Sequence, residues 1–212
     1  MLEKNVTKEF THPSQSSFWT RCVITASSAT LGVEKKCITG LMFLLTFLIL
    51  LNVVTRYSGA PIYWIDESAV YSVVWLTFIG GSAMTRLRMD FAVSIVTDRL
   101  PQTYKKTAKV LAGTGVTFFA IALTWMCVLW FDPVGYFQSG FDAKALAGKT
   151  FNFLYTERTQ TLGWPTWVIY LIIPIFSVTM IIHSLANLLE DLGWIEPASS
   201  VDINLGGAEG IN

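Results

Sequence analysis

Two adjacent acids, Asp66 and Glu67, are the residues of this chain whose position says most about chemistry. They stand where an apolar segment begins, a short loop after Arg56. Neighbouring side chains on a helix project about 100° apart, so this pair is not placed as a catalytic dyad. Two interpretations stay open. Either the acids stabilise a helix N-terminus and pair with Arg56, or they contact another subunit or a translocation path.

A possible nucleotide-binding motif covers residues 143–150, which read Ala-Lys-Ala-Leu-Ala-Gly-Lys-Thr. A phosphate-binding loop needs a glycine at its first position, a buried strand before it and a helix after it. Ala143 occupies the first position, and the surrounding stretch is too short for a nucleotide-binding fold. We therefore do not expect this segment to bind a nucleotide.

Metal, haem and thiol chemistry lack the residues that they need. The chain has two histidines, His12 and His183, and three scattered cysteines. The cysteines are Cys22, Cys37 and Cys127. A lone histidine in an apolar segment, such as His183, is more often a packed or interfacial side chain than a proton relay. We predict no catalytic residue, no cofactor and no metal site.

The composition places the chain in a membrane. Of its 212 residues, 52% are hydrophobic and 14% are charged, whereas soluble domains carry about 25% charged residues. The mean hydropathy is +0.50. The net charge is zero, which gives no indication of nucleic-acid binding.

Four apolar segments are long enough to cross a bilayer, which requires about 20 residues. They cover residues 37–55, 68–85, 110–131 and 162–189, each bounded by charged residues. The sequence therefore predicts an all-α membrane protein with four transmembrane helices. Pro174 lies inside the fourth segment and is expected to kink it.

The distribution of lysine and arginine predicts the orientation. Eleven of these residues precede the first segment or lie between the second and third, against four on the opposite side. Positive residues favour the cytoplasm, so both termini are predicted to be cytoplasmic. The predicted domains are a cytoplasmic segment 1–36, a transmembrane domain 37–189 and a disordered tail 190–212.

Several residues near the cytoplasmic boundary are expected to meet the membrane surface. Arg86, Arg88, Lys105 and Lys106 would attract anionic lipid, each contributing about 1 kcal/mol. Residues 18–33 and 91–100 have apolar faces, and each is either an interfacial helix or an ordinary cytoplasmic connection.

The second apolar segment carries residues suited to packing between helices. Trp75 and Phe78 are bulky and lie at mid-membrane depth, and Gly80 opens a run of small residues that allows close approach. Asn52 in the first segment is a candidate for a hydrogen bond between helices. The partner of these residues is either within the chain or another subunit.

Taken together, these residues resemble the small membrane subunit, DctQ type, of tripartite ATP-independent periplasmic (TRAP) transporters. The resemblance covers residues 37–101 and the fourth segment. It rests on Asn52, Arg56-Tyr57, Trp64-Ile65-Asp66-Glu67, Trp75 to Gly81, Arg86, Leu100-Pro101, and Trp164 to Tyr170 followed by Pro174. Asp90 and Ser94 stand where many members carry a histidine and an acid.

The resemblance implies a function in the bacterial inner membrane. A periplasmic binding protein would deliver an organic acid, and a large membrane subunit would move it with sodium. The present chain would be a non-catalytic scaffold for that large subunit. Its 132–161 loop would contact the binding protein. The alternative is a structural subunit of another inner-membrane complex.

Overall fold

The computed structural model describes residues 18–89 and 101–194. Within these ranges the chain is helical and forms no strand beyond a single antiparallel bridge between Arg158 and Pro165. The helices are α1 (Phe18–Tyr57), α2 (Tyr63–Arg86), α4 (Gln102–Phe131), α5 (Pro133–Gln138), α6 (Ala143–Thr150), α7 (Thr166–Tyr170) and α8 (Ile172–Leu192). The predicted interfacial segment 91–100 and the positions Asp90 and Ser94 lie outside the described residues.

Four helical stretches are long and apolar enough to cross a membrane, which confirms the predicted fold class. They are α1, α2, α4 with α5, and α7 with α8. The predicted fourth span begins too early, because residues 162–165 form a loop that is bonded to α2. The predicted tail begins too early as well, since α8 continues to Leu192.

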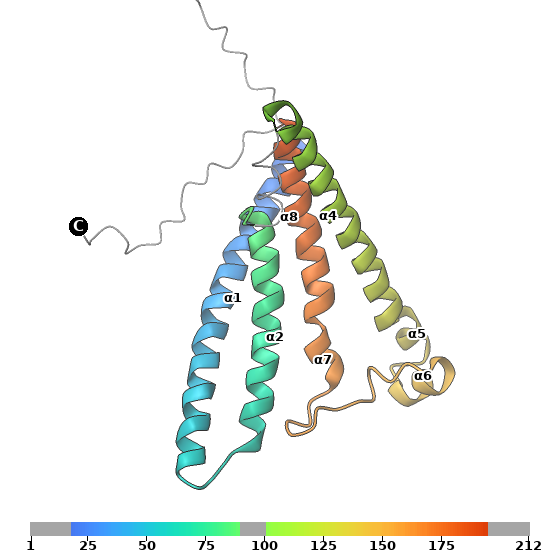
Figure 1. Ribbon diagram of the computed structural model, residues 1–212. Helices are drawn as coiled ribbons and strands as arrows, with labels where there is room; N and C mark the ends of the chain where they lie inside the picture. The colour runs from blue at the N-terminus through green and yellow to red at the C-terminus, as the bar shows by residue number, and fades with distance from the viewer. Residues whose placement is uncertain (1–17, 90–100, 195–212) are drawn as a thin grey trace, which may run out of the picture.

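Helix α1 is longer than a bilayer requires. Its 40 residues span about 60 Å, against a hydrocarbon core of about 30 Å. Residues 18–33 are the first part of this helix and continue without a break into the predicted span. The first part of α1 therefore extends beyond the core on the side where both ends of the described chain lie (Figure 1).

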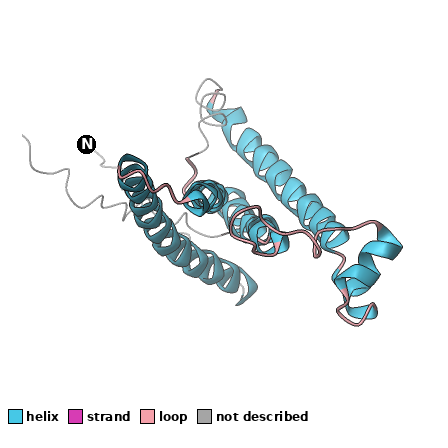
Figure 2. Ribbon diagram, turned by 90° about the horizontal axis from the view of Figure 1, so that it is seen from below, coloured by secondary structure: helices cyan, strands magenta, loops and turns pink. Residues whose placement is uncertain are grey.

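Helix α8 is the centre of the bundle. It packs against α1, α2 and α4, whereas α4 makes nearly all its helix contacts with α8. The helices converge where α1 begins and α8 ends, and they spread apart toward the α1–α2 loop (Figure 1). We call these the terminal end and the loop end. Viewed along the bundle, α4 diverges from the other helices (Figure 2).

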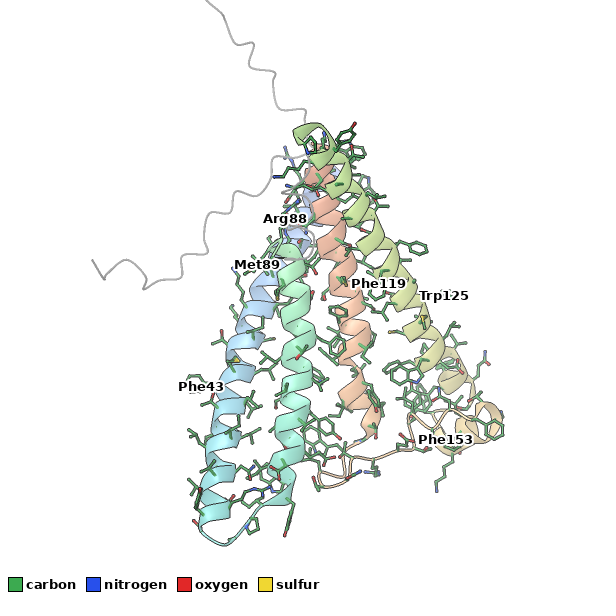
Figure 3. The ribbon with its side chains drawn as sticks, viewed as in Figure 1. Phe43, Arg88, Met89, Phe119, Trp125 and Phe153 are labelled. Carbon is green, nitrogen blue, oxygen red and sulfur yellow. The ribbon has the colours of Figure 1, made fainter. Side chains whose placement is uncertain are left out.

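Small and polar residues make the closest contacts between helices. Ser82, Ser177 and Ser184 are buried, and the Ser82 hydroxyl lies 2.7 Å from that of Thr179 on α8. Larger apolar side chains such as Phe43, Phe119 and Trp125 point outward (Figure 3). This pattern suits a bilayer, where close packing and hydrogen bonds drive helix association.

The last transmembrane stretch is interrupted just before Pro174. Proline has no N–H to donate to the carbonyl of Tyr170, and its ring crowds that carbonyl. As a result α7 ends at Tyr170 and α8 begins at Ile172. The sequence predicts a kink at Pro174, and the interruption falls one turn earlier, at Leu171.

His183 joins α8 to the first part of α1 through a fully buried cluster. Its Nδ1 atom lies 2.8 Å from the Ser27 hydroxyl, and its Nε2 atom lies 3.1 Å from a Glu34 carboxylate oxygen. The exposed fraction is zero for Ser27 and His183 and 6% for Glu34. His183 is thus a packed side chain. The sequence did not identify its two partners, Ser27 and Glu34.

Replacing His183 with alanine should loosen the first part of α1. The buried Glu34 and Ser27 groups would lose their partner, which costs about 2 kcal/mol in the free energy of unfolding. Hydrogen–deuterium exchange of residues 18–36 should accelerate. Ser28→Ala is the control, because the Ser28 hydroxyl bonds only to the backbone of its own helix. Equal exchange in His183→Ala and the parent chain would show that the cluster does not hold α1.

Candidate functional site

At the loop end, Asp66 joins α2 to α1. Arg56 Nη2 lies 2.6 Å from one Asp66 carboxylate oxygen, and Asn52 Nδ2 donates to the other at 2.6 Å. Arg56 also donates through Nε to the Asn52 side-chain oxygen. The side chains of Arg56 and Asp66 are 58% and 47% exposed, so the ion pair contributes at most about 1 kcal/mol. Its main effect is to fix the register of α1 against α2.

Glu67, the neighbour of Asp66, binds a different part of the chain. Its carboxylate accepts the backbone N–H groups of Gln160, Thr161 and Leu162 at 2.8–2.9 Å, and also the Thr161 hydroxyl. The Tyr71 hydroxyl donates to it from the next turn of α2. Five donors saturate a carboxylate, which has about four lone-pair positions. Glu67 therefore anchors the loop between α6 and α7 onto α2.

The loop that Glu67 anchors is a tight hairpin, residues 157–166. The Thr159 N–H donates to the Trp164 carbonyl, and the Trp164 N–H donates to the Thr159 hydroxyl. Arg158 donates to the Gly163 carbonyl. Gly163 has a φ of +66°, in the left-handed region that glycine adopts without strain. The turn thus holds the three N–H groups that face Glu67 close to one another.

The bulky residues of α2 face α7 and α8. Trp75 Nε1 donates to the Ile169 carbonyl at 3.1 Å, and Phe78 packs edge-to-face on Phe176 with ring centres 5.3 Å apart. Gly80 lies on an open side, where an added Cβ would meet nothing within 4 Å. Trp64 is 44% exposed at the loop end. Packing within the chain therefore accounts for Trp75 and Phe78, whereas Gly80 and Trp64 remain available to a partner.

At the terminal end, Arg86 forms a buried ion pair between α2 and α8. Its guanidinium donates to Glu190 at 2.8 Å and to Asn187 at 2.6 Å. The side chains of Arg86 and Glu190 are 8% and 2% exposed. Asn187 in turn donates to the carbonyl of Thr85, at the end of α2. Arg86 is thus enclosed by its own chain, contrary to its expected role at the lipid surface.

Arg88 extends this cluster into the polypeptide that follows α2. Its backbone has a φ of +55°, which brings the guanidinium to Glu190 at 3.1 Å and Asp191 at 2.7 Å. Burial opposes the charged form, but the Asp191 and Glu190 carboxylates raise the pKa of Arg88 above its ordinary value. Arg88 therefore stays charged, and two arginines hold the end of α8.

The segment after α4 is fixed by two of its side chains, which donate to the last carbonyls of α4. The Tyr155 hydroxyl donates to the Phe131 carbonyl and the Asn152 amide to the Trp130 carbonyl, both at 2.7 Å. Burial raises the pKa of the Tyr155 phenol, so it remains a donor at neutral pH. Residues 143–150 form α6, capped by Asp142, instead of a phosphate-binding loop.

No catalytic arrangement emerges from these clusters. Their charged groups are bonded to one another, and no group of three histidine, cysteine or acidic residues that could hold a metal ion occurs within residues 18–89 and 101–194. The His183 cluster holds a serine, a histidine and a glutamate, but it is enclosed and has no room for a substrate. Among the described residues, these contacts join helices and fix loops.

Comparison with known proteins identifies the family of the chain. The profile of the DctQ component of tripartite ATP-independent periplasmic transporters matches residues 45–193, more than two thirds of the chain. The chain belongs to this family. It is thus a TRAP transporter component and a multi-pass protein of the inner membrane.

A curated relative supports the same family at low identity. The isethionate TRAP transporter permease protein DctMQ of Oleidesulfovibrio alaskensis is 23% identical to the chain over 181 residues. The match covers 82% of this chain but 25% of the relative, so the chain spans about a quarter of that protein's length.

The DctQ match includes the Asp66, Glu67 and Arg86 clusters, whereas Ser27 and Glu34 precede it. The sequence singled out Asn52, Arg56 and Asp66, which the structure brings together at the loop end. It also singled out Glu67, which binds the 157–166 hairpin instead. It missed Glu190, which it uses only as the boundary of the fourth apolar segment, and Asn187, which lies inside that segment. A signal was available, because Glu190 is the acid that ends the fourth segment and Arg86 is the base that ends the second.

Removing the Glu67 carboxylate should release the 157–166 hairpin. In Glu67→Ala the three N–H groups lose their acceptor, and trypsin should cleave after Arg158 about tenfold faster, because the loop opens more often. Glu67→Gln should be intermediate. Asp66→Ala is the matched control, since Asp66 binds only α1. If Asp66→Ala accelerates cleavage as much as Glu67→Ala, the hairpin is not held by Glu67.

Breaking the buried Arg86–Glu190 pair should destabilise the bundle. Arg86→Met leaves Glu190 with Arg88 alone and is expected to cost about 3 kcal/mol in the free energy of unfolding. The double variant Arg86→Met/Glu190→Met should lose less, because no buried charge is left without its partner. Thermal unfolding in detergent measures the stability of the single variants Arg86→Met and Glu190→Met and of the double variant, with the exposed Lys144→Met as control. A double variant that loses the sum of both single effects would contradict the pairing.

Proposed function

We propose that this DctQ-family chain is the small, non-catalytic subunit of a sodium-coupled TRAP transporter that imports an organic acid. The observation that supports this role is the bonding of its charged groups. Asp66, Glu67, Arg86, His183 and Glu190 each bind other residues of the same chain. Because these five charged or titratable groups of the described chain are bonded in this way, none of them is available to bind and release a coupling ion. Sodium and substrate sites are therefore assigned to the large subunit.

The relative with the DctMQ name supports a large partner. The chain matches only a quarter of that protein, which leaves most of its length for a second component. We propose that the present chain packs against such a component as a separate or joined subunit. We name the substrate only as an organic acid, because we assign its binding to the large subunit and the binding protein.

The open faces of α1 and α2 are proposed to meet the large subunit. The most apolar window of α1 is 6% buried, against 22–28% for the other spans. Gly80 adds a site on α2 where another helix could approach closely. Packing of α1 against the large subunit would cover the span that its own chain covers least.

The loop end is proposed to face the periplasm and the binding protein. This follows from the predicted orientation, with both termini in the cytoplasm. The 132–161 loop carries exposed Phe137, Phe141, Phe151 and Phe153 at this end. A cavity of about 510 Å³ lies between this loop and the end of α4, lined in part by Trp130 and Tyr170. Glu67 holds the adjoining hairpin, so it would set the shape that the binding protein meets.

Affinity purification of the chain in mild detergent tests the proposal. We expect a large polytopic permease in about equal amount, identified by mass spectrometry, because a scaffold of this kind needs its partner. Glu67→Ala should reduce complex assembly or sodium-dependent uptake with the binding protein. Asp66→Ala, which leaves the hairpin anchored, is the matched variant. Recovery of the chain alone, stable and without a permease, would contradict the proposal.

A further inference from the structure

A cavity of about 440 Å³ opens at the terminal end between the start of α4 and the end of α8. Its lining consists of three lysines from α4 and two acids from α8. These residues are Lys105, Lys106, Lys109, Glu190 and Asp191. Lys106 and Lys109 are exposed, and Lys105 is partly buried. The Lys106 ammonium lies 3.9 Å from the point where a Cβ on Gly193 would sit, so it reaches the C-terminus of α8.

The charges in and beside this cavity do not balance. Glu190 and Asp191 are already bonded to Arg86 and Arg88. Leaving Lys105 out of the count, four basic side chains among the described residues (Arg86, Arg88, Lys106 and Lys109) surround two carboxylates, a net charge of +2. Neither Lys106 nor Lys109 pairs with an acid among the described residues. The cavity is therefore suited to an anion.

The residues around the cavity are of the kinds found at the boundary between lipid headgroups and acyl chains. Lys109 is followed directly by the apolar segment of α4, and Leu111, the second residue of that segment, is 72% exposed. Tyr104 and Trp194 are 63% and 59% exposed at the same end, as aromatic residues are at a membrane interface. A phosphate among the lysines would thus lie at headgroup depth, with its acyl chains along the exposed side of α4.

We propose that this cavity binds the phosphate of an anionic phospholipid in the leaflet at the terminal end. The inference requires only that the chain spans a membrane, and it does not depend on the transport function proposed above. Lysine-rich pockets between transmembrane helices are suited to such headgroups. Bound there, the lipid joins α4 to the arginine cluster of α2 and α8. This contact matters because α4 has almost no helix neighbour other than α8.

Native mass spectrometry of the full chain with added lipid tests this site. The probes are phosphatidylglycerol, cardiolipin and phosphatidylcholine with the same acyl chains. Phosphatidylglycerol and cardiolipin should bind at least about fivefold more than phosphatidylcholine, because only they carry net negative charge. Lys106→Ala/Lys109→Ala should lower their binding to the phosphatidylcholine level. The matched control is Lys144→Ala/Lys149→Ala, which removes two exposed lysines at the loop end.

Two further arms complete the test. Lys106→Glu/Lys109→Glu should bind anionic lipid no better than the alanine pair, while helical content in phosphatidylcholine nanodiscs stays at the parent level. Inorganic phosphate at millimolar concentration should not displace phosphatidylglycerol. Full displacement by phosphate would mean that the cavity takes a free anion, and the lipid proposal would be wrong. Equal binding of the three lipids, or an equal loss in the loop-end control, would also overturn it.

Discussion

Apolar side chains gain no hydrophobic free energy by leaving lipid for another helix, so a bundle in a bilayer depends on close packing and on hydrogen bonds to fix its register. In this chain polar clusters meet that need. Asp66 joins α1 to α2, Arg86 joins α2 to α8, and His183 joins α8 to α1. Each of the three helix pairs is thus fixed by a side chain whose loss would leave a polar group without its partner. The packing of α1, α2 and α8 depends on these bonds.

Helix α4 differs from these three helices, because none of the three polar clusters includes it. It is held by packing on α8, where Leu188 lies beside Gly113, and by hydrogen bonds from Asn152 and Tyr155 to its last carbonyls. The bundle spreads apart on this side (Figure 2). The difference between the tightly bonded helices and α4 indicates two roles within one chain. One part is a fixed frame, and the other carries the large loop at the end where a binding protein is proposed to dock.

The parts that could be predicted from the sequence are those set by local physics. The length of apolar segments and the charges that bound them predict the four spans, and the 100° angle between neighbours separates Asp66 from Glu67. The partners could not be predicted in the same way. Arg86 and Glu190 lie on different helices, and only the packing of α2 on α8 brings them together. The contact between His183 and Glu34 could not be predicted either, because most of the chain separates the two residues.

The same clusters bear on what the chain can do within a transporter. A group that carries an ion or a proton across a membrane must exchange partners during the cycle, and its bonds must be weak enough to break. Glu67 has five donors, and Glu190 is held by two arginines at a buried site. Such groups resist exchange, since each alternative state would leave a charge without its hydrogen bonds. We therefore assign motion to the partner. The open faces of α1 and α2, the loop end and the lysine cavity are the surfaces of this DctQ subunit that we propose for binding.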